Sequence, residues 1–276
     1  MTIRQNTTPL SYLFFCMLFI LTACSQNPPK DTPENTHAES TSTTEKKEAA
    51  HWSYAGESGP ENWAAIEKKS DCGGQAQSPI NIIEKDAVSS TTKEKLFDFH
   101  YAEQTLIHDV INNGHSIQYN FEHGDHIDYK GDEFDLKQFH FHEPSEHTIN
   151  GIRYPLEIHL VHQNAAKEYL VLSFMAIEGE TSPTFSFLES YLPIKVGETK
   201  AVKATFDFNE ILAGKESCFH YTGSLTTPPC TEGVKWFIFK EPITVSEEQV
   251  KELQILMPLN NYRTTQAMNG RTVEVM

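Results

Sequence analysis

Histidines recur with a two-residue period in the middle of the chain, and this pattern constrains the fold more than any other feature. Residues 138–163 read QFHFHEPSEHTINGIRYPLEIHLVHQ and hold five of the thirteen histidines. Alternate side chains of a β-strand point to the same face of its sheet. His140 and His142 therefore project together, and pairing with the strand that carries His159 would bring three imidazoles to one point.

Three converging imidazoles are the ligand set of a catalytic zinc, which takes nitrogen at roughly 2.0–2.1 Å and keeps a fourth position open. Gln138 shares the face of His140, and Glu157 shares the face of His159. Each can accept the spare ring N–H of its neighbour and so fix the tautomer. A lone His-x-His pair is usually structural, but a third histidine beside a same-face carboxylate favours metal. We predict one Zn²⁺ per chain, held by His140, His142 and His159.

Two further histidines of the same stretch do not fit these faces. His147 and His162 are predicted to be structural, each held by hydrogen bonds.

Strand patterns dominate the rest of the globular part. Apolar, β-branched and aromatic residues alternate over Ser116–Phe121, Gln138–His142, Leu156–Val161, Tyr169–Ile177 and Val234–Lys240. The best helix is Val245–Met257, where Ser246 followed by Gln249 resembles a capping box, and Thr184–Leu192 is a shorter candidate. These patterns predict a mostly β (α+β) domain with one large sheet and few helices.

The N-terminus has the composition of an export signal. Leu10–Ala23 is apolar, too short for a comfortable permanent span and suited to a signal-peptide core. It ends in Leu-Thr-Ala-Cys, which resembles a bacterial lipobox, so Cys24 is expected to be lipidated. An ordinary cleavage site nearby, with Cys24 incidental, is the alternative. Either way we expect an exported protein of the periplasm or cell envelope. If Cys24 is lipidated, as we expect, the lipid anchor also holds the protein at a membrane.

Composition divides the chain into three parts. Residues 1–23 are the expected signal peptide, and 24–50 are Ser, Thr, Pro, Glu and Lys with almost no apolar content. Such a segment cannot form a core and is predicted to be a disordered tether spanning roughly 30 Å. The single globular domain is expected over 51–276.

Charge and cysteine content limit the partners. Acidic residues outnumber basic ones by 38 to 22, giving a formal net charge of -16. A chain that repels phosphate and has no basic cluster is not expected to bind nucleic acid. In an oxidising compartment Cys72, Cys218 and Cys230 allow one disulfide and leave one thiol over. Three pairings are open, and spacing alone does not choose between them.

Several motifs occur in the order found in one enzyme family. They are HWSYAGESGPENW (51–63), QSPINI (77–82), NNGHS (112–116), GSLTTPPCTEGVKW (223–236) and NNYRTTQAMNGR (260–271). With the histidine stretch they resemble the α-class carbonic anhydrases over essentially all of 51–276. The resemblance implies a twisted, predominantly antiparallel central sheet with a few short peripheral helices and zinc at the bottom of a conical cleft.

The resemblance also implies a reaction, the reversible hydration of carbon dioxide to bicarbonate and a proton. Hydroxide on the zinc would attack CO2, with Thr226 orienting it by donating its own proton to Glu146. His115 would then carry the released proton to solvent, because a side chain with a pKa near 6.5 accepts protons better than bulk water does.

Further roles carry over by position. The substrate pocket is expected to comprise Val161, Val171, Leu225, Thr227, Val234 and Trp236, and the water network Tyr54, Asn113 and Gln118. Exported members of the family bridge the positions of Cys72 and Cys230, which would leave Cys218 free with no assigned role. Ser78–Pro79 and Pro228–Pro229 are expected to be cis.

Two other functions are compatible with such a domain. A carbonic-anhydrase-like surface binding module with weak catalysis is the main alternative, but relatives of that kind usually lack a zinc histidine. A periplasmic zinc store would need more soft or acidic ligands. Nothing in the sequence sets the oligomeric state, so a homodimer is left open.

Overall fold

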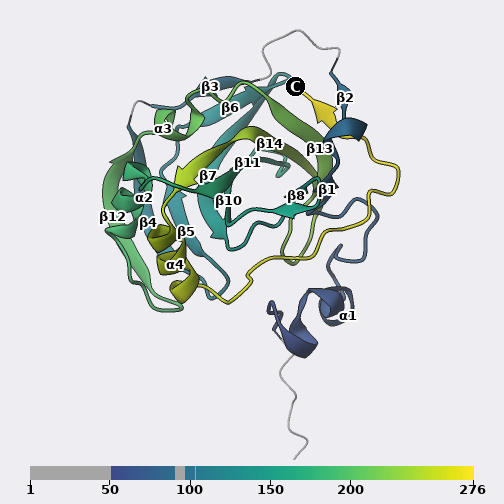
Figure 1. Cartoon of the computed structure of the whole chain (residues 1–276), viewed down its shortest axis with the longest axis horizontal. Helices are drawn as coiled ribbons and strands as arrows, with labels where there is room; N and C mark the ends of the chain where they lie inside the picture. The colour runs from purple at the N-terminus through teal and green to yellow at the C-terminus, as the bar shows by residue number, and fades with distance from the viewer. Residues whose placement is uncertain (1–50, 91–96, 103) are drawn as a thin grey trace, which may run out of the picture. The chain divides into compact units, whose positions relative to one another are not determined.

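Among the residues that the structure describes, a mixed sheet of twelve strands runs through the domain (Figure 1). The computed structural model describes residues 51–90, 97–102 and 104–276. The expected signal peptide, Cys24 and the expected tether therefore lie outside the described residues. In the sheet the order is β12-β4-β5-β7-β10-β11-β14-β13-β15-β2, and β6 pairs with both β7 and β3. Most neighbours are antiparallel, as expected, whereas β11–β14 and β15–β2 are parallel.

The strands of this sheet are β2 (Val88–Ser89), β3 (Asp98–His100), β4 (Thr105–Asn112), β5 (Ile117–Phe121), β6 (His126–Tyr129), β7 (Asp132–His142), β10 (Leu156–Gln163), β11 (Tyr169–Glu178), β12 (Thr199–Phe206), β13 (Cys218–Ser224), β14 (Glu232–Val245) and β15 (Glu274–Val275). A second sheet comprises β1 (Asn81–Ile82), β8 (Thr148–Ile149) and β9 (Ile152–Arg153). All five strands predicted from the sequence are confirmed, with β7 and β14 longer than the patterns indicated.

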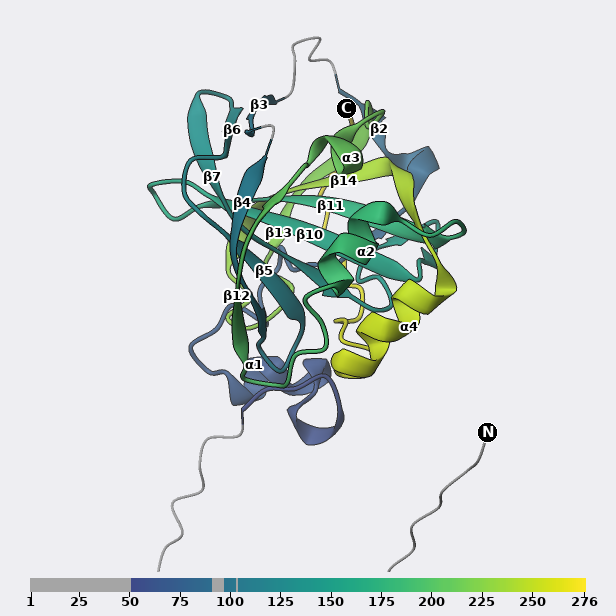
Figure 2. The ribbon, with the colours of Figure 1, turned by 90° about the vertical axis from the view of Figure 1, so that its left-hand side faces the viewer.

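The helices are short. They are α1 (Trp63–Ile66), α2 (Pro183–Glu189), α3 (Asn209–Leu212) and α4 (Glu247–Leu256), with 3-10 turns at Gly56–Ser58, Pro60–Asn62 and Glu84–Asp86. The two predicted helices are confirmed as α2 and α4, and Ser246 and Gln249 form the predicted capping box. Gln249 also reaches across to Ser182 at the start of α2, accepting from its N–H at 2.9 Å. Figure 2 shows α2 and α4 together on one side of the strands.

The two faces of the central strands carry different side chains. Phe139 and Phe141 on β7 and Leu160 on β10 belong to the larger apolar core, and Phe141 is only 1% exposed. The intervening residues His140 and His142 face the other way, because side chains alternate along a strand. The predicted alternation therefore separates the core from a second, more polar face.

The register between β7 and β10 sets the site. His140 lies opposite His159, and His142 lies opposite Glu157. Strand β5 adds Gln118 opposite His140. Three strands therefore place their polar side chains at one position on the sheet.

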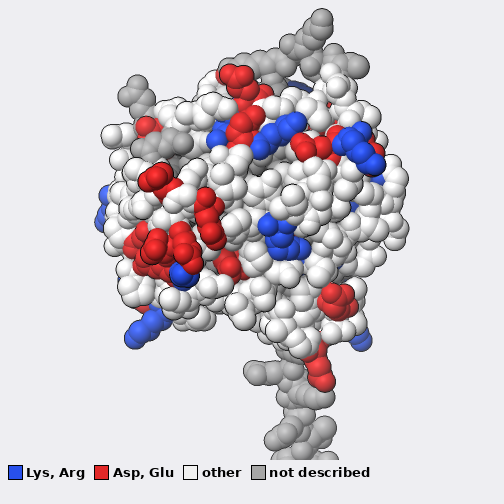
Figure 3. Space-filling model, in the orientation of Figure 1, with Lys and Arg blue, Asp and Glu red and all other residues white. Residues whose placement is uncertain are grey.

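On the face shown in Figure 3, acidic groups gather over the region of α2 and α4, whereas Lys and Arg lie scattered. Within the described ranges, no helix is long and apolar enough to cross a membrane.

Candidate active site

His140, His142 and His159 converge from β7 and β10. Their ring centroids lie 4.7 to 5.2 Å apart. One nitrogen from each ring falls within 4.8 Å of the other two. His142 and His159 are 1% exposed, and His140 is half-buried. The structure therefore brings these three side chains together, as the sequence analysis predicts.

The two partners predicted from strand periodicity are in contact with their histidines. His140 Nδ1 donates to Gln138 Oε1 at 2.9 Å, and His159 Nε2 donates to Glu157 Oε1 at 2.7 Å. These bonds fix the tautomers, since the nitrogen that donates carries the proton. His140 Nε2 and His159 Nδ1 are therefore the nitrogens with a free lone pair.

His142 is held by a group that the sequence did not reveal. Its Nδ1 donates to the main-chain oxygen of Asn261 at 2.6 Å. Its Nε2 is buried and has no hydrogen-bond partner within the described chain, although Glu146 Oε2 lies 3.3 Å away. A buried polar atom without a partner is costly unless something binds it. The ring thus presents a lone pair to the same point as the other two.

Burial keeps all three imidazoles neutral. It lowers the pKa of His142 to about 4, against the raising effect of the Asn261 carbonyl. Burial and the neighbouring histidines hold the pKa of His140 well below its usual value. Burial also lowers the pKa of His159, opposed by Glu157. Because only a neutral imidazole can ligate a metal, the cluster is ready for a cation at neutral pH.

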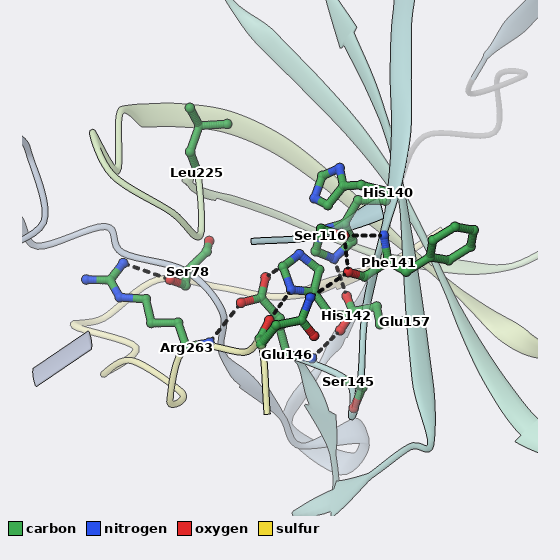
Figure 4. Close-up of polar contacts among 12 residues, drawn as sticks. Ser78, Ser116, His140, Phe141, His142, Ser145, Glu146, Glu157, Leu225 and Arg263 are labelled. Atoms are coloured by element: carbon green, nitrogen blue, oxygen red, sulfur yellow. Dashed lines mark hydrogen bonds and ion pairs between the residues drawn. The ribbon is translucent and has the colours of Figure 1, made fainter. Parts of the chain in front are cut away.

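Glu157 organises the buried side of the site (Figure 4). Its Oε1 accepts from His147 Nδ1, His159 Nε2 and Ser173 Oγ at 2.6 to 2.7 Å. Its Oε2 accepts from the main-chain N–H groups of Glu146 and His147 at 2.7 and 2.8 Å. Burial alone would raise the pKa of Glu157, but the two histidines and these bonds hold it well below its usual range.

The two histidines predicted to be structural are confirmed as hydrogen-bonded. His147 lies between Glu157 and the Tyr221 hydroxyl, both at 2.7 Å. His162 lies between the Tyr101 hydroxyl at 2.5 Å and the Leu170 carbonyl at 3.3 Å.

Glu146 is fully buried beside the cluster. Its Oε1 accepts from the main-chain N–H of Arg263 at 2.9 Å, whereas Oε2 makes no well-directed hydrogen bond in the described chain. Burial raises the pKa of Glu146 to about 7, while His159 and the nearby Thr226 side chain act to lower it. Thr226 and Glu146, paired in the sequence analysis by resemblance alone, are therefore neighbours in space.

His115 follows a turn that the sequence motif forms. The Asn113 side-chain oxygen accepts from the His115 N–H at 2.9 Å, and Asn113 Nδ2 donates to Gln118 at 3.3 Å. The His115 ring stacks on Trp52 with centroids 3.7 Å apart, and its Nε2 lies 3.3 Å from His51 Nε2. Burial, then the charge of His51, lowers the pKa of His115.

The expected substrate pocket is mainly apolar. Val161, Val171, Val234 and Trp236 belong to one buried cluster, with Leu225 packed against it. The Trp236 ring centroid lies 4.8 Å from that of His159. Thr227, also expected here, is half-buried, and its carbonyl accepts from the Cys230 N–H at 2.8 Å.

Tyr54, expected to order water, has a buried hydroxyl without a partner among the described residues and interacts electrostatically with Glu146.

The loop that carries Thr226 is anchored covalently. Cys72 and Cys230 form a disulfide, as expected, and Cys218 is free and buried. Burial raises the pKa of the Cys218 thiol to about 12, so it is unreactive at neutral pH. The peptide bonds before Pro79 and Pro229 are cis, as expected.

Two residues near the C-terminus were missed as site residues. The Asn261 side chain donates to the carbonyls of His115 and Phe141 and accepts from the Glu143 N–H. Arg263 is 2% exposed and donates to the Cys72 carbonyl at 2.9 Å. The segment 260–271 was matched to the family, but no role was assigned within it. The only sequence feature that could have indicated a role for Asn261 and Arg263 is that they are polar residues in a stretch that otherwise has the composition of a loop.

Comparisons with known proteins cover most of the chain. A family model described as eukaryotic-type carbonic anhydrase matches residues 58–276. A carbonic anhydrase of Klebsiella pneumoniae is 39% identical over 82% of this chain and 91% of its own length. A carbonic anhydrase of Neisseria gonorrhoeae is 36% identical over 81% of this chain and 87% of its own.

Solved structures share the fold. The α-carbonic anhydrase of Thermovibrio ammonificans, in complex with the inhibitor sulfanilamide, has a TM-score of 0.77 at 37% identity, covering 82% of this chain and 99% of that one. Dioscorin complexed with ascorbate has a TM-score of 0.75 at 30% identity, covering 82% and 98%.

Proposed function

The chain belongs to the eukaryotic-type (α) carbonic anhydrases, which interconvert carbon dioxide and bicarbonate, and we propose that it does so with one zinc ion held by His140, His142 and His159. The observation that carries the proposal is the hydrogen bonding of the three rings. In each ring one nitrogen donates a hydrogen bond to an oxygen, and the other nitrogen faces those of the other two rings.

Zinc fits this donor set better than a hard cation does, because three neutral imidazoles suit zinc and carboxylates or carbonyls suit magnesium or calcium. The buried, unpartnered Nε2 of His142 is the atom that most needs such a partner. Bound there, zinc would supply a water with a pKa lowered from 15.7 to about 7, a magnitude already known for carbonic anhydrase and carried over here.

Thr226 and Glu146 would orient the attacking oxygen. A hydroxyl has one proton, so a Thr226 that donates to Glu146 can only accept from the nucleophile. That arrangement aims a lone pair of the nucleophile at the substrate. The Arg263 N–H, at 2.9 Å from Glu146 Oε1, holds the carboxyl in place.

Carbon dioxide would bind against the apolar cluster beside His159. Val161, Val171, Val234 and Trp236 offer no charged group, which suits an apolar substrate. The proton would leave through His115, which lies at a turn and is half-buried, so that its ring can exchange protons with both the site and solvent.

The experiment is the variant His140→Ala, assayed for bound zinc and for CO2 hydration. Both are expected to fall together, because two imidazoles no longer hold the ion tightly. The control is His220→Gln, which changes a half-buried histidine of β13 outside the cluster. Full zinc content with full activity in His140→Ala would overturn the ligand assignment. Wild-type protein that binds zinc but does not hydrate CO2 would favour the binding module instead.

Export and lipidation are part of the proposal and are supported by the sequence alone. The apolar run before Cys24 and the Leu-Thr-Ala-Cys sequence match a lipoprotein signal. In cells, Cys24→Ser is expected to move the protein from the membrane fraction to the soluble one. Unchanged partitioning would rule out the anchor.

A further inference from the structure

A second group of histidines and carboxylates lies on the strand pair β3–β6, remote from the active site. His100 on β3 pairs directly with His126 on β6, and Asp98 pairs with Asp128. In Figures 1 and 2 this strand pair lies at the top of the domain, at the end opposite to α1. The catalytic mechanism uses none of these residues.

The ring nitrogens of this group already face carboxylates. His100 Nε2 lies 3.1 Å from Asp128 Oδ2 and 3.7 Å from Asp98 Oδ2. His126 Nε2 lies 3.7 Å from Glu133 Oε2. The two imidazole rings are stacked, with centroids 4.6 Å apart. The potential ligand atoms of His100, His126 and Asp128 all fall within 4.8 Å of one another.

Hydrogen bonding prepares His126 as a ligand. Its Nδ1 lies 3.1 Å from the Gly124 carbonyl, which can only accept, so Nδ1 carries the proton in this bond. The lone pair of the neutral ring is then on Nε2, the nitrogen that faces Glu133. A main-chain carbonyl orients His142 in the active site in the same way.

Charge also favours a cation at this position. Three carboxylates surround two imidazoles, in a chain whose formal net charge is -16. The His100 and Asp128 side chains are 43% and 47% exposed, so an ion can enter and keep water ligands. Two nitrogens with a carboxylate oxygen form a ligand set that suits zinc.

We propose that His100, His126 and Asp128 bind a second divalent transition-metal cation, of which zinc is the representative. Glu133 and Asp98 would add negative charge around it. Side-chain rotations that unstack the two rings would bring the three ligand atoms to roughly 2.0–2.2 Å from the ion. Among the described residues β3 pairs only with β6, so the ion would join this short strand to the sheet.

This site cannot be the catalytic one. β6 pairs with the first half of β7, where His126 lies opposite Asp135, whereas His140 lies five residues further along β7. Five residues of extended strand span roughly 16 Å. One ion therefore cannot contact both groups.

The test is zinc stoichiometry of the full protein, measured by equilibrium dialysis against buffered free zinc. We expect two ions per chain, one tightly bound and one more weakly bound. His100→Ala and His126→Gln should each lower the affinity for the second ion. The loss should exceed the ~10–100-fold loss of affinity that follows removal of a supporting hydrogen-bond partner. CO2 hydration should be unchanged in both variants.

His108→Ala is the matched control, because His108 is an exposed histidine bonded to an adjacent carboxylate, Asp109. It should retain both ions. His140→Ala should lose the tight ion and keep the weak one, which separates failure of the catalytic assignment from failure of this one. A wild-type protein that binds a single ion would overturn the second site, as would a second ion that survives both His100→Ala and His126→Gln.

Discussion

Replacing Glu157 by glutamine tests whether one buried carboxylate holds the active site together. The change keeps the size of the side chain and removes one acceptor oxygen. In the structure Oε1 accepts three hydrogen bonds and Oε2 accepts two. Because the amide NH2 cannot accept, glutamine leaves two donors unpaired in either orientation. These are the two main-chain N–H groups, or His147 and His159 if the amide is turned round, since the Ser173 hydroxyl can then accept instead.

The magnitude follows from these lost bonds. A buried donor left without an acceptor costs about 1–3 kcal/mol, so two of them lower the free energy of unfolding by roughly 2–6 kcal/mol. If the amide turns round, His159 loses the acceptor that fixes its tautomer. Zinc affinity is then expected to fall by about 10–100-fold, the usual effect of removing such a partner.

The assays are urea unfolding of the zinc-free protein and zinc affinity by competition with a chelator. The control is Ser173→Ala, which removes one donor to Glu157 Oε1 and leaves the carboxylate with its other four bonds. Ser173→Ala should lower the free energy of unfolding by only about 1 kcal/mol, because it leaves no donor unpaired. A glutamine variant as stable as the control, with unchanged zinc affinity, would refute the reasoning.

The remaining predictions concern proton transfer, acid stability and the disulfide. His115→Ala should slow CO2 hydration in dilute buffer and be rescued by imidazole, whereas an equal loss in concentrated buffer would assign His115 another role. Burial lowers the pKa of His162 to about 3 from its usual 6.5. The unfolded chain therefore binds the extra proton, and stability should fall as pH drops from 6.5 toward 3, by up to about 1.4 kcal/mol per pH unit. In urea titrations at several pH values His162→Gln should make this slope shallower, and an unchanged slope would contradict the assignment. The Cys72–Cys230 bond closes a loop with a sequence separation of 158, worth about 5 kcal/mol at most in the chain-entropy estimate. Reductant should lower the melting temperature by up to roughly 10–20 °C, and an unchanged midpoint would show that the bond does not stabilise the fold.

Local periodicity was enough to predict the central part of the site. The two-residue alternation assigned His140 and His142 to one face and Phe141 to the other, and the structure agrees. The contacts of Gln138 and Glu157 with their histidines followed from the same rule, since residues two apart on a strand are neighbours on one face. The capping box of α4 was equally local.

Other parts of the site depended on resemblance to a family. The residues alone left three disulfide pairings open, and only the family pattern selected Cys72 with Cys230. Thr226 and Glu146 are eighty positions apart in the sequence, and no local pattern brings them together.

Only the tertiary structure could identify the third partner of the histidine cluster. Asn261 binds His142 through its main-chain oxygen, across a sequence separation of 119. Every residue has such an oxygen, so no side-chain pattern marks the one that will be used. The same limit applies to His100 and His126, which become neighbours through the register of β3 and β6. Alternation along a strand is a local property that sequence determines, whereas register between distant segments is decided by packing of the whole domain.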